Sequence, residues 1–182
     1  RAKQFSFKSV GIQAQGRTTI LKINYRNTTQ ILQTANLIAA EVLKPLDQDE
    51  DGVPLIQPIS CGREGSQPLV IRLSFPRDEV KKIAELLACA HDEGRAWGDM
   101  AVICRDFAAM DKCVKEFKMR KLPYEVRKGA GHFNPEQDAI KVMTMRASKG
   151  LEFPVVALPG IGRMPLAGED ELNEAQLFYV AA

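Results

Sequence analysis

The chain lacks the residue patterns that mark metal, disulfide and membrane proteins. Its 182 residues include four cysteines and two histidines. The cysteines form no C-x-x-C pair, and His91 and His132 stand apart from them, so zinc and disulfide spacings are both missing. No apolar run approaches the roughly 20 residues that span a bilayer, and no signal-type apolar core follows the basic N-terminus. We therefore expect reduced thiols, no bound metal, no membrane association and a cytoplasmic location.

A strong net charge is also absent. Lys and Arg number 25 and Asp and Glu 23, so the formal net charge is only +2. This balance argues against a strongly basic coat, although a local basic patch can still hold nucleic acid. Seven cations could form such a patch, but charges of this kind are usually solvated faces. These seven are Arg63, Arg72, Lys118, Arg120, Lys121, Arg127 and Lys128.

The phosphate-binding pattern G-x-x-x-x-G-K-[ST] occurs nowhere in the chain, although Lys149-Gly150 is superficially similar to its end. The chain by itself therefore contains no complete site for ATP hydrolysis. It also offers no pair of nucleophile and base, which makes a small-molecule α/β enzyme the least favoured hypothesis. Because the chain opens at Arg1 and stops at Ala182 inside a helical pattern, we expect it to be a piece of a longer protein.

Hydrophobic periodicity predicts strands that alternate with helices. Strands are expected at 18–24, 69–75, 100–104, 124–127, 140–145 and 155–158, and helices at 28–44, 78–91, after Arg105 and at 169–182. This order is typical of an α/β domain with a mainly parallel sheet flanked by helices. Residues 45–68, rich in Pro and Gly, predict a long loop or extended excursion with part of 55–59 extended, and 129–138 a polar turn.

Three finer features are also predicted from the pattern. Asn27 is the expected cap of the first helix. The last helix is expected to direct four side chains inward, namely Leu172, Ala175, Tyr179 and Ala182. Three of the cysteines lie in apolar patterns and should behave as small core residues, and Trp97 should anchor a loop rather than stack on a base.

Residues 142–153 are the best candidates for chemistry, because an apolar, β-prone segment there leads directly into polar residues. Ligands of an open parallel sheet bind beyond the carboxyl ends of its strands. The side chains that could meet a phosphorylated ligand at this place are Thr144, Arg146, Ser148, Lys149 and Glu152. A second cluster, Asn24-Tyr25-Arg26, also follows a predicted strand, and we expect both clusters to meet at one sheet edge.

Tyr25 and Arg26 together would suit a nucleotide. The arginine fork matches phosphate oxygens, and the tyrosine ring offers a flat face to a base. The alternatives are a surface salt bridge for Arg26 and a half-buried ring with a hydrogen-bonded hydroxyl for Tyr25. Residue types alone leave these alternatives open.

Three motifs resemble, in order, those of the UvrD/Rep-type superfamily 1 DNA helicases. Residues 21–26 (LKINYR), followed by Ile31 and Ala35-Asn36, resemble motif IV. Residues 144–153 (TMRASKGLEF) resemble motif V, and residues 174–182 (EAQLFYVAA) the opening of motif VI. The resemblance implies that residues 1–182 form one C-terminal, RecA-like motor domain of an ATP-dependent helicase or translocase. The partner would be an N-terminal RecA-like domain that carries the Mg²⁺ ligands, so this chain alone is expected to be inactive.

The resemblance also implies roles for individual residues. Arg26 would contact the γ-phosphate of ATP and act in catalysis, and Tyr25 would border the adenine. Lys149, Gly150 and Glu152 would belong to the nucleotide pocket. The residues expected toward single-stranded DNA are Thr144, Arg146, Ser148 and Arg105, of which Arg105 could instead support a helix.

The sequence departs from the family in ways that bear on function. Arg146 occupies the place of the usual histidine, and a solvated ion pair is its alternative role. The short path over 127–139 leaves no room for the large helical accessory insertion of the best-known members. The chain also ends before the arginine that follows Tyr-Val-Ala in the family. The rival hypothesis is a non-catalytic module that keeps the helicase fold to bind nucleic acid or protein.

Overall fold

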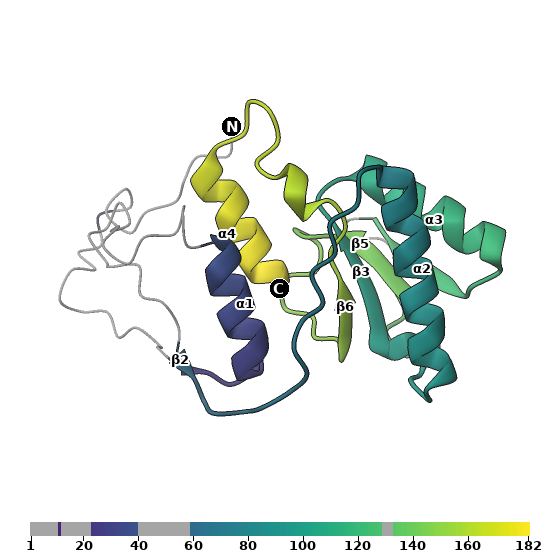
Figure 1. Cartoon of the computed structure of the whole chain (residues 1–182), viewed down its shortest axis with the longest axis horizontal. Coiled ribbons are helices and arrows are strands. Elements are labelled where there is room, and N and C mark those ends of the chain that lie inside the picture. The colour runs from purple at the N-terminus through teal and green to yellow at the C-terminus, as the bar shows by residue number, and fades with distance from the viewer. Residues whose placement is uncertain (1–10, 12–22, 40–58, 129–132) are drawn as a thin grey trace. The chain divides into compact units, whose positions relative to one another are not determined.

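The computed structural model of the protein describes residues 11, 23–39, 59–128 and 133–182 (Figure 1). The chain divides into two compact units, residues 1–69 and residues 70–182. No helix within the described ranges is both long and apolar enough to cross a membrane.

The second unit is built on a four-stranded sheet whose strands all run parallel. Its strands are β3 (Met100–Cys104), β4 (Tyr124–Arg127), β5 (Ile140–Thr144) and β6 (Val155–Ala157), in the order β4-β5-β3-β6. The sequence prediction of an α/β domain with a mainly parallel sheet is confirmed. The inner strand β3 is buried along its whole length, as expected for a parallel sheet covered on both faces.

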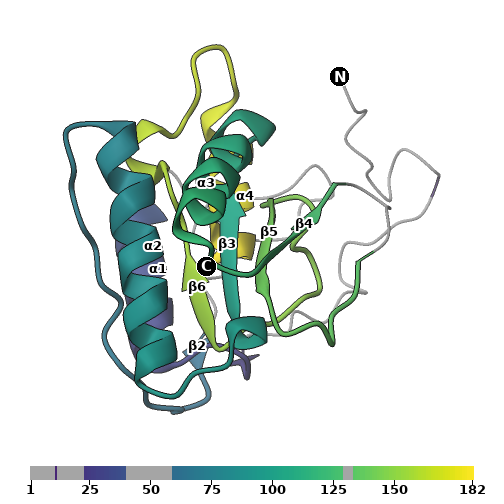
Figure 2. The same cartoon turned by 90° about the vertical axis from the view of Figure 1, so that its right-hand side faces the viewer.

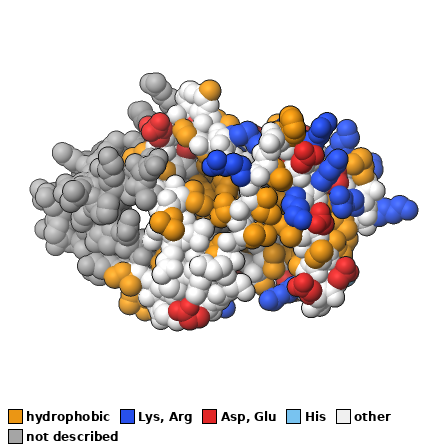
Figure 3. All heavy atoms as spheres, in the orientation of Figure 1, with side chains coloured by type: hydrophobic (Ala, Val, Ile, Leu, Met, Phe, Trp, Pro, Cys, Tyr) orange, Lys and Arg blue, Asp and Glu red, His pale blue; other side chains and the backbone are white. Residues whose placement is uncertain are grey.

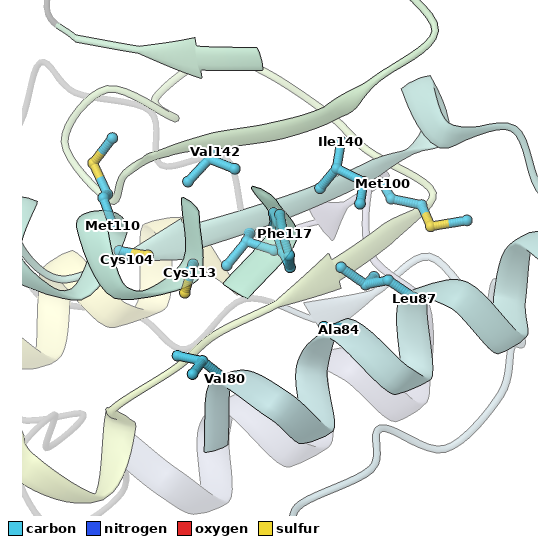
Figure 4. Packing of buried hydrophobic residues seen from close by; sticks show 11 residues of the cluster. Val80, Ala84, Leu87, Met100, Cys104, Met110, Cys113, Phe117, Ile140 and Val142 are labelled. Carbon is cyan, nitrogen blue, oxygen red and sulfur yellow. The ribbon is translucent and has the colours of Figure 1, made fainter. Parts of the chain in front are cut away.

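Helices α2 (Pro76–Asp92) and α3 (Phe107–Arg120) cover one face of this sheet. Their apolar side chains pack with those of β3 and β5 in a single core cluster (Figure 4). Phe117 of α3, the largest side chain in this core, is fully buried. Asp106 caps the start of α3 by accepting a hydrogen bond from the Ala109 N–H at 2.7 Å, and Lys121 ends it in the left-handed conformation.

Helix α4 (Glu171–Ala181) covers the opposite face. Figure 2 shows α3 in front of the sheet and α4 behind it. The alternate residues of the strands, among them Ala101, Ile103 and Met143, pack in a second cluster with Ala181. Because successive residues of a strand point to opposite faces of the sheet, alternate residues of the same strands belong to the two different clusters.

The inward face of α4 differs from the prediction. Its buried side chains are Glu174, Phe178 and Ala181, whereas Leu172, Ala175, Tyr179 and Ala182 are only half-buried. The prediction followed apolar residues alone, and it was wrong because a charged residue, Glu174, occupies the buried face. Hydrophobic periodicity counts only apolar residues, so it does not identify a buried helix face that includes a glutamate.

The first unit contains β1 (Ile23–Asn24), α1 (Thr29–Ala39) and β2 (Ile59–Ser60). β1 and β2 pair in parallel. The predicted strand at 18–24, helix at 28–44 and extended piece at 55–59 are confirmed in their described parts, while 18–22, 40–44 and 45–58 lie outside the described residues. The first helix is capped by Thr28 rather than Asn27, since the Thr28 hydroxyl accepts from the Ile31 N–H at 3.3 Å.

Residues 69–75, predicted as a strand, form no strand. Their apolar side chains lie in solvent, with Leu69 71% and Val70 62% exposed. A β-prone segment becomes a strand only where a neighbouring backbone pairs with it and one face is buried, and no strand of the described residues pairs with this one. The prediction was wrong because local composition does not supply a partner.

Trp97 and the cysteines can be compared with their predictions. The Trp97 ring stacks on His91 with 4.0 Å between ring centroids and packs against the core, so its role as a loop anchor is confirmed. Cys104 and Cys113 are buried core residues as expected, but Cys89 is exposed. A hydrogen bond with Cys113, together with burial, raises the pKa of Cys104, so that its thiol stays protonated.

Candidate functional site

The carboxyl ends of all four strands of the second unit lie at one edge of the sheet. Cys104 of β3 pairs with Thr144 of β5, and β4 and β6 run in the same direction beside them. The residues that follow, including Arg105 after β3 and Arg146 after β5, therefore share this edge. In open α/β sheets this is the edge at which ligands bind.

The segment after β5 folds back on itself in a tight, hydrogen-bonded turn. The Thr144 carbonyl accepts from the N–H groups of Ala147 at 2.9 Å and Ser148 at 3.0 Å. The Met145 N–H donates to the Cys104 carbonyl at 2.8 Å, which ties the turn to β3. Gly150 follows with φ of 84°, a conformation that residues with a side chain rarely adopt. The backbone thus fixes which side chains of this turn face outward.

Two predicted site residues in this turn serve its structure. Ser148 is buried, and its hydroxyl donates to the Met145 carbonyl at 2.8 Å. Thr144 is half-buried, and its hydroxyl accepts from the Ala147 N–H at 3.3 Å. Beneath them Met145, Leu151 and Phe153 pack into the second core cluster. These contacts hold the turn against the sheet.

The remaining predicted residues of the turn face solvent. Arg146, Lys149, Gly150 and Glu152 are all exposed. Among the described residues no carboxylate pairs with Arg146 or Lys149. The alternative of an ion pair for Arg146 is therefore wrong within the described part of the chain. The hydrogen-bonded turn therefore presents two cations, Arg146 and Lys149, and the carboxylate of Glu152 at its surface.

Arg105 lies at the same edge but is held inside the protein. Its Nε donates to Glu174 Oε2 at 2.7 Å, and a second guanidinium nitrogen contacts Glu174 Oε1. The two side chains are only 12% and 4% exposed, and Glu169 lies 3.9 Å from the same guanidinium. The hydrogen bond with Glu174 raises the pKa of Arg105. Of the two predicted roles for Arg105, the geometry favours support of a helix, because the pair joins β3 to α4.

Sequence reasoning missed Glu174 as a functional residue. A signal for it exists, since Glu174, Phe178 and Ala181 are spaced as one helical face. A carboxylate on the apolar face of a helix is seldom buried without a cation. That spacing should have predicted a partner from another element.

The second predicted cluster lies in the first unit. The Asn24 side chain accepts from the N–H groups of Arg26 at 2.9 Å and Asn27 at 3.0 Å, which bends the chain directly after β1. Tyr25 and Arg26 are exposed on this bend, and the Tyr25 ring is 70% exposed. The alternative of a half-buried ring for Tyr25 is therefore wrong. The Arg63 guanidinium donates to the Arg26 carbonyl at 3.4 Å and holds the bend from the other side.

The two clusters do not share a sheet in the described residues. β1 pairs with β2 in a two-stranded sheet, whereas β5 belongs to the four-stranded sheet. The prediction assumed that every strand enters one sheet. It fails there because β1 pairs with β2 and with no strand of the four-stranded sheet.

The described residues contain no candidate metal-binding site. They contain no group of three or more His, Cys, Asp or Glu side chains that could hold an ion. We therefore assign no metal ligand to these residues.

Comparison with known proteins places the chain in a family. The family model of the UvrD-like helicase C-terminal domain matches residues 19–137 and 128–182, which together span most of the chain. The chain belongs to this family. The match runs across the boundary between the two units, and its two pieces overlap at residues 128–137. No protein with a curated description matches the chain.

A solved structure supports the same fold. It is the C-terminal domain of a possible DNA helicase from Lactobacillus plantarum WCFS1, with a TM-score of 0.55 and 21% sequence identity. The similarity covers 87% of this chain and 80% of that one. The chain therefore has the fold of a helicase C-terminal domain, the architecture that motifs IV to VI predicted.

Proposed function

We propose that this chain is the C-terminal motor domain of an ATP-dependent DNA helicase or translocase of superfamily 1. In this role it supplies part of an ATP site and part of a track for single-stranded DNA. The observation that carries the proposal is the family match from residue 19 to residue 182. The exposed turn after β5 supports it, because two of its cations have no carboxylate partner in the part of the chain that the structure describes. The partner is an N-terminal RecA-like domain of the same protein.

On the DNA side, Arg146 contacts backbone phosphates. It is an exposed cation at a sheet edge, and it has no carboxylate partner in the described ranges. Phosphate contacts of this kind position a nucleic acid without reading its sequence. Thr144 and Ser148 act mainly by holding the turn, because their hydroxyls bond to its backbone. Arg105 acts indirectly, through α4.

On the ATP side, Tyr25 and Arg26 act together from the bend after β1. The exposed Tyr25 ring borders the adenine, and Arg26 stabilises the negative charge that develops on the γ-phosphate. The family resemblance assigns Lys149, Gly150 and Glu152, in the turn after β5, to nucleotide binding as well. The Mg²⁺ that accompanies ATP is held by the N-terminal domain, and it shields phosphate charge when bound.

The proposal is tested in a polypeptide that joins the N-terminal RecA-like domain to this chain. Arg26→Ala should lower DNA-stimulated ATP hydrolysis by about 10³-fold, the effect of removing a cation from a phosphoryl-transfer site. Single-stranded DNA binding, measured by fluorescence anisotropy, should persist. The matched control is Arg95→Ala, an exposed arginine outside both clusters, which should leave hydrolysis unchanged.

Two outcomes would contradict the proposal at different levels. Full ATP hydrolysis by the Arg26→Ala protein would remove Arg26 from the site while leaving the domain's role intact. DNA binding without any ATP hydrolysis in the unaltered protein would favour the non-catalytic binding module.

A further inference from the structure

The positive charge of the chain is concentrated around α3 and β4. Residues 111–128 contain seven of the 25 Lys and Arg residues and three of the 23 Asp and Glu residues. This stretch therefore carries a formal charge of +4, while the rest of the chain carries −2. Figure 3 shows many Lys and Arg side chains, with some Asp and Glu among them, over the part of the surface where α2 and α3 lie. A chain of nearly neutral charge thus has one distinctly basic face.

The acidic residues of this stretch are largely withdrawn from the surface. Glu116 is buried and pairs with Arg120 at 2.7 Å. Glu125 points inward and pairs with the fully buried Lys141, also at 2.7 Å. Asp111 remains exposed, 3.9 Å from Lys128. The local anions therefore cancel little of the surface charge.

Four lysines form the exposed centre of this face, which we call the α3 lysine face. Lys112, Lys115 and Lys118 follow each other at intervals of three residues on α3, and Lys121 ends the helix. All four are exposed. Within the described ranges none of them has a carboxylate partner. Their charges are available to a ligand.

Helix stability does not explain this arrangement. Cations favour the last turn of a helix, which can account for Lys118 and Lys121 but not for Lys112 and Lys115 in the earlier turns. Lysines three residues apart are neighbours on the helix surface and repel each other. An anionic partner would relieve this repulsion.

We propose that the α3 lysine face binds the phosphate backbone of duplex DNA. The four lysines span about 14 Å along the helix, close to the roughly 12 Å width of the major groove between its two rows of phosphates. Of the two aromatic rings in this stretch, Phe117 is buried and Tyr124 is half-buried and packs against the core, so residues 111–128 present no exposed ring for stacking the bases of a single strand. The face lies along a helix that covers the sheet, distinct from the turn after β5.

The experiment compares salt-dependent binding of a labelled 20-base-pair blunt duplex by fluorescence anisotropy. In the triple variant Lys112→Gln, Lys115→Gln, Lys118→Gln, affinity at low salt should fall at least tenfold. The slope of log K against log salt should become shallower by up to about 2.7, since each lost phosphate contact contributes about 0.9. Circular dichroism verifies that the variant is folded.

A matched control separates this face from bulk charge. The variant Arg77→Gln, Lys81→Gln, Arg95→Gln removes three exposed cations elsewhere, and it should retain most of the affinity. Equal losses in the two triple variants, or an unchanged salt slope in the lysine variant, would overturn the proposal. Binding of poly-glutamate as tight as that of the duplex would also overturn it, because the face would then select anions in general.

A single-strand arm keeps this inference separate from the proposed function. The lysine variant should bind a labelled oligo-dT with affinity close to that of the unaltered chain. An equal loss for both DNA forms would assign the lysines to the single-strand track and overturn the duplex proposal. Loss of oligo-dT binding by Arg146→Ala alone concerns the turn after β5 and leaves the α3 lysine face intact.

Discussion

Arg105 and Arg146 stand in nearly the same place in the fold and have opposite surroundings. Each follows a buried strand, and the two strands are paired neighbours with Cys104 opposite Thr144. Arg105 is 12% exposed and forms a two-pronged ion pair with Glu174. Arg146 is exposed and has no carboxylate partner among the described residues. A carboxylate delivered by another element decides whether such an arginine supports the fold or remains available to a ligand.

A pair of lysines repeats this contrast. Lys141 in β5 is fully buried, and its ammonium donates to Glu125 and to the carbonyls of Asn134 and Gln137 at 2.7 to 2.9 Å. Lys149, eight residues later, is exposed at the turn. Burying an ammonium is costly unless all its protons find acceptors, and Lys141 meets that condition. The buried lysine ties Glu125 of β4 to Asn134 and Gln137, which precede β5.

Removing one partner of the buried pair should have the largest effect on stability. Glu174→Gln leaves the Arg105 charge mostly buried without its counter-ion, and the free energy of unfolding should fall by about 3 kcal/mol. Urea denaturation followed by far-UV circular dichroism measures this loss. The double variant Arg105→Leu, Glu174→Leu removes both charges and should recover most of it. If the free energy of unfolding of Glu174→Gln fell by less than about 1 kcal/mol, the Arg105–Glu174 pair would not be an important support of the fold, and the contrast with the exposed Arg146 would fail.

The exposed arginine should behave in the opposite way. Arg146→Ala should change the free energy of unfolding by no more than about 0.5 kcal/mol, as for other surface sites. Its affinity for labelled oligo-dT should fall severalfold, with a salt slope shallower by about 0.7 for one lost phosphate contact. Arg146→Lys keeps the charge and should retain most of this binding. An unaltered slope in Arg146→Ala would exclude a phosphate contact.

The smallest effect is expected from pH, through Glu125. Burial raises the pKa of this carboxyl, but hydrogen bonds from the Asn134 N–H and the Lys141 ammonium outweigh burial, and the pKa is lowered below its ordinary 4.5. Glu125 should therefore stabilise the fold above about pH 4.5 and lose this contribution as the pH falls further. Urea denaturation between pH 6 and pH 3 should show a weaker pH dependence for Glu125→Gln. Lys141→Met should weaken it similarly, and unchanged profiles in both variants would contradict the assignment.

Much of the fold could be predicted because its elements have strong local signals. The strands at 100–104 and 124–127 were predicted to the residue, and that at 140–145 to within one residue. Short β-prone runs bounded by polar or turn-forming residues mark these boundaries. The wrong prediction of a strand at 69–75 also rested on a local signal. Apolar, β-branched residues favour a strand, but they do not supply the neighbouring strand with which it must pair.

The candidate site was predictable in part. Motifs IV and V identified the two exposed clusters, since their residues are local and contiguous. The buried role of Ser148, the cap by Thr28 and the partner of Arg105 were not predicted. Each depends on a hydrogen bond whose acceptor or donor was not evident from the local pattern of residue types.

The sequence by itself determined the types and order of the elements of the parallel sheet and the membership of the chain in a helicase family. Hydrophobic periodicity and motifs extend over one helical turn or one strand, so they can be recognised from the sequence alone. Only the tertiary structure decided which cations are buried and which remain exposed. Glu174 meets Arg105 across 69 residues of sequence, and the cost of burying a charge depends on that distant partner rather than on local sequence.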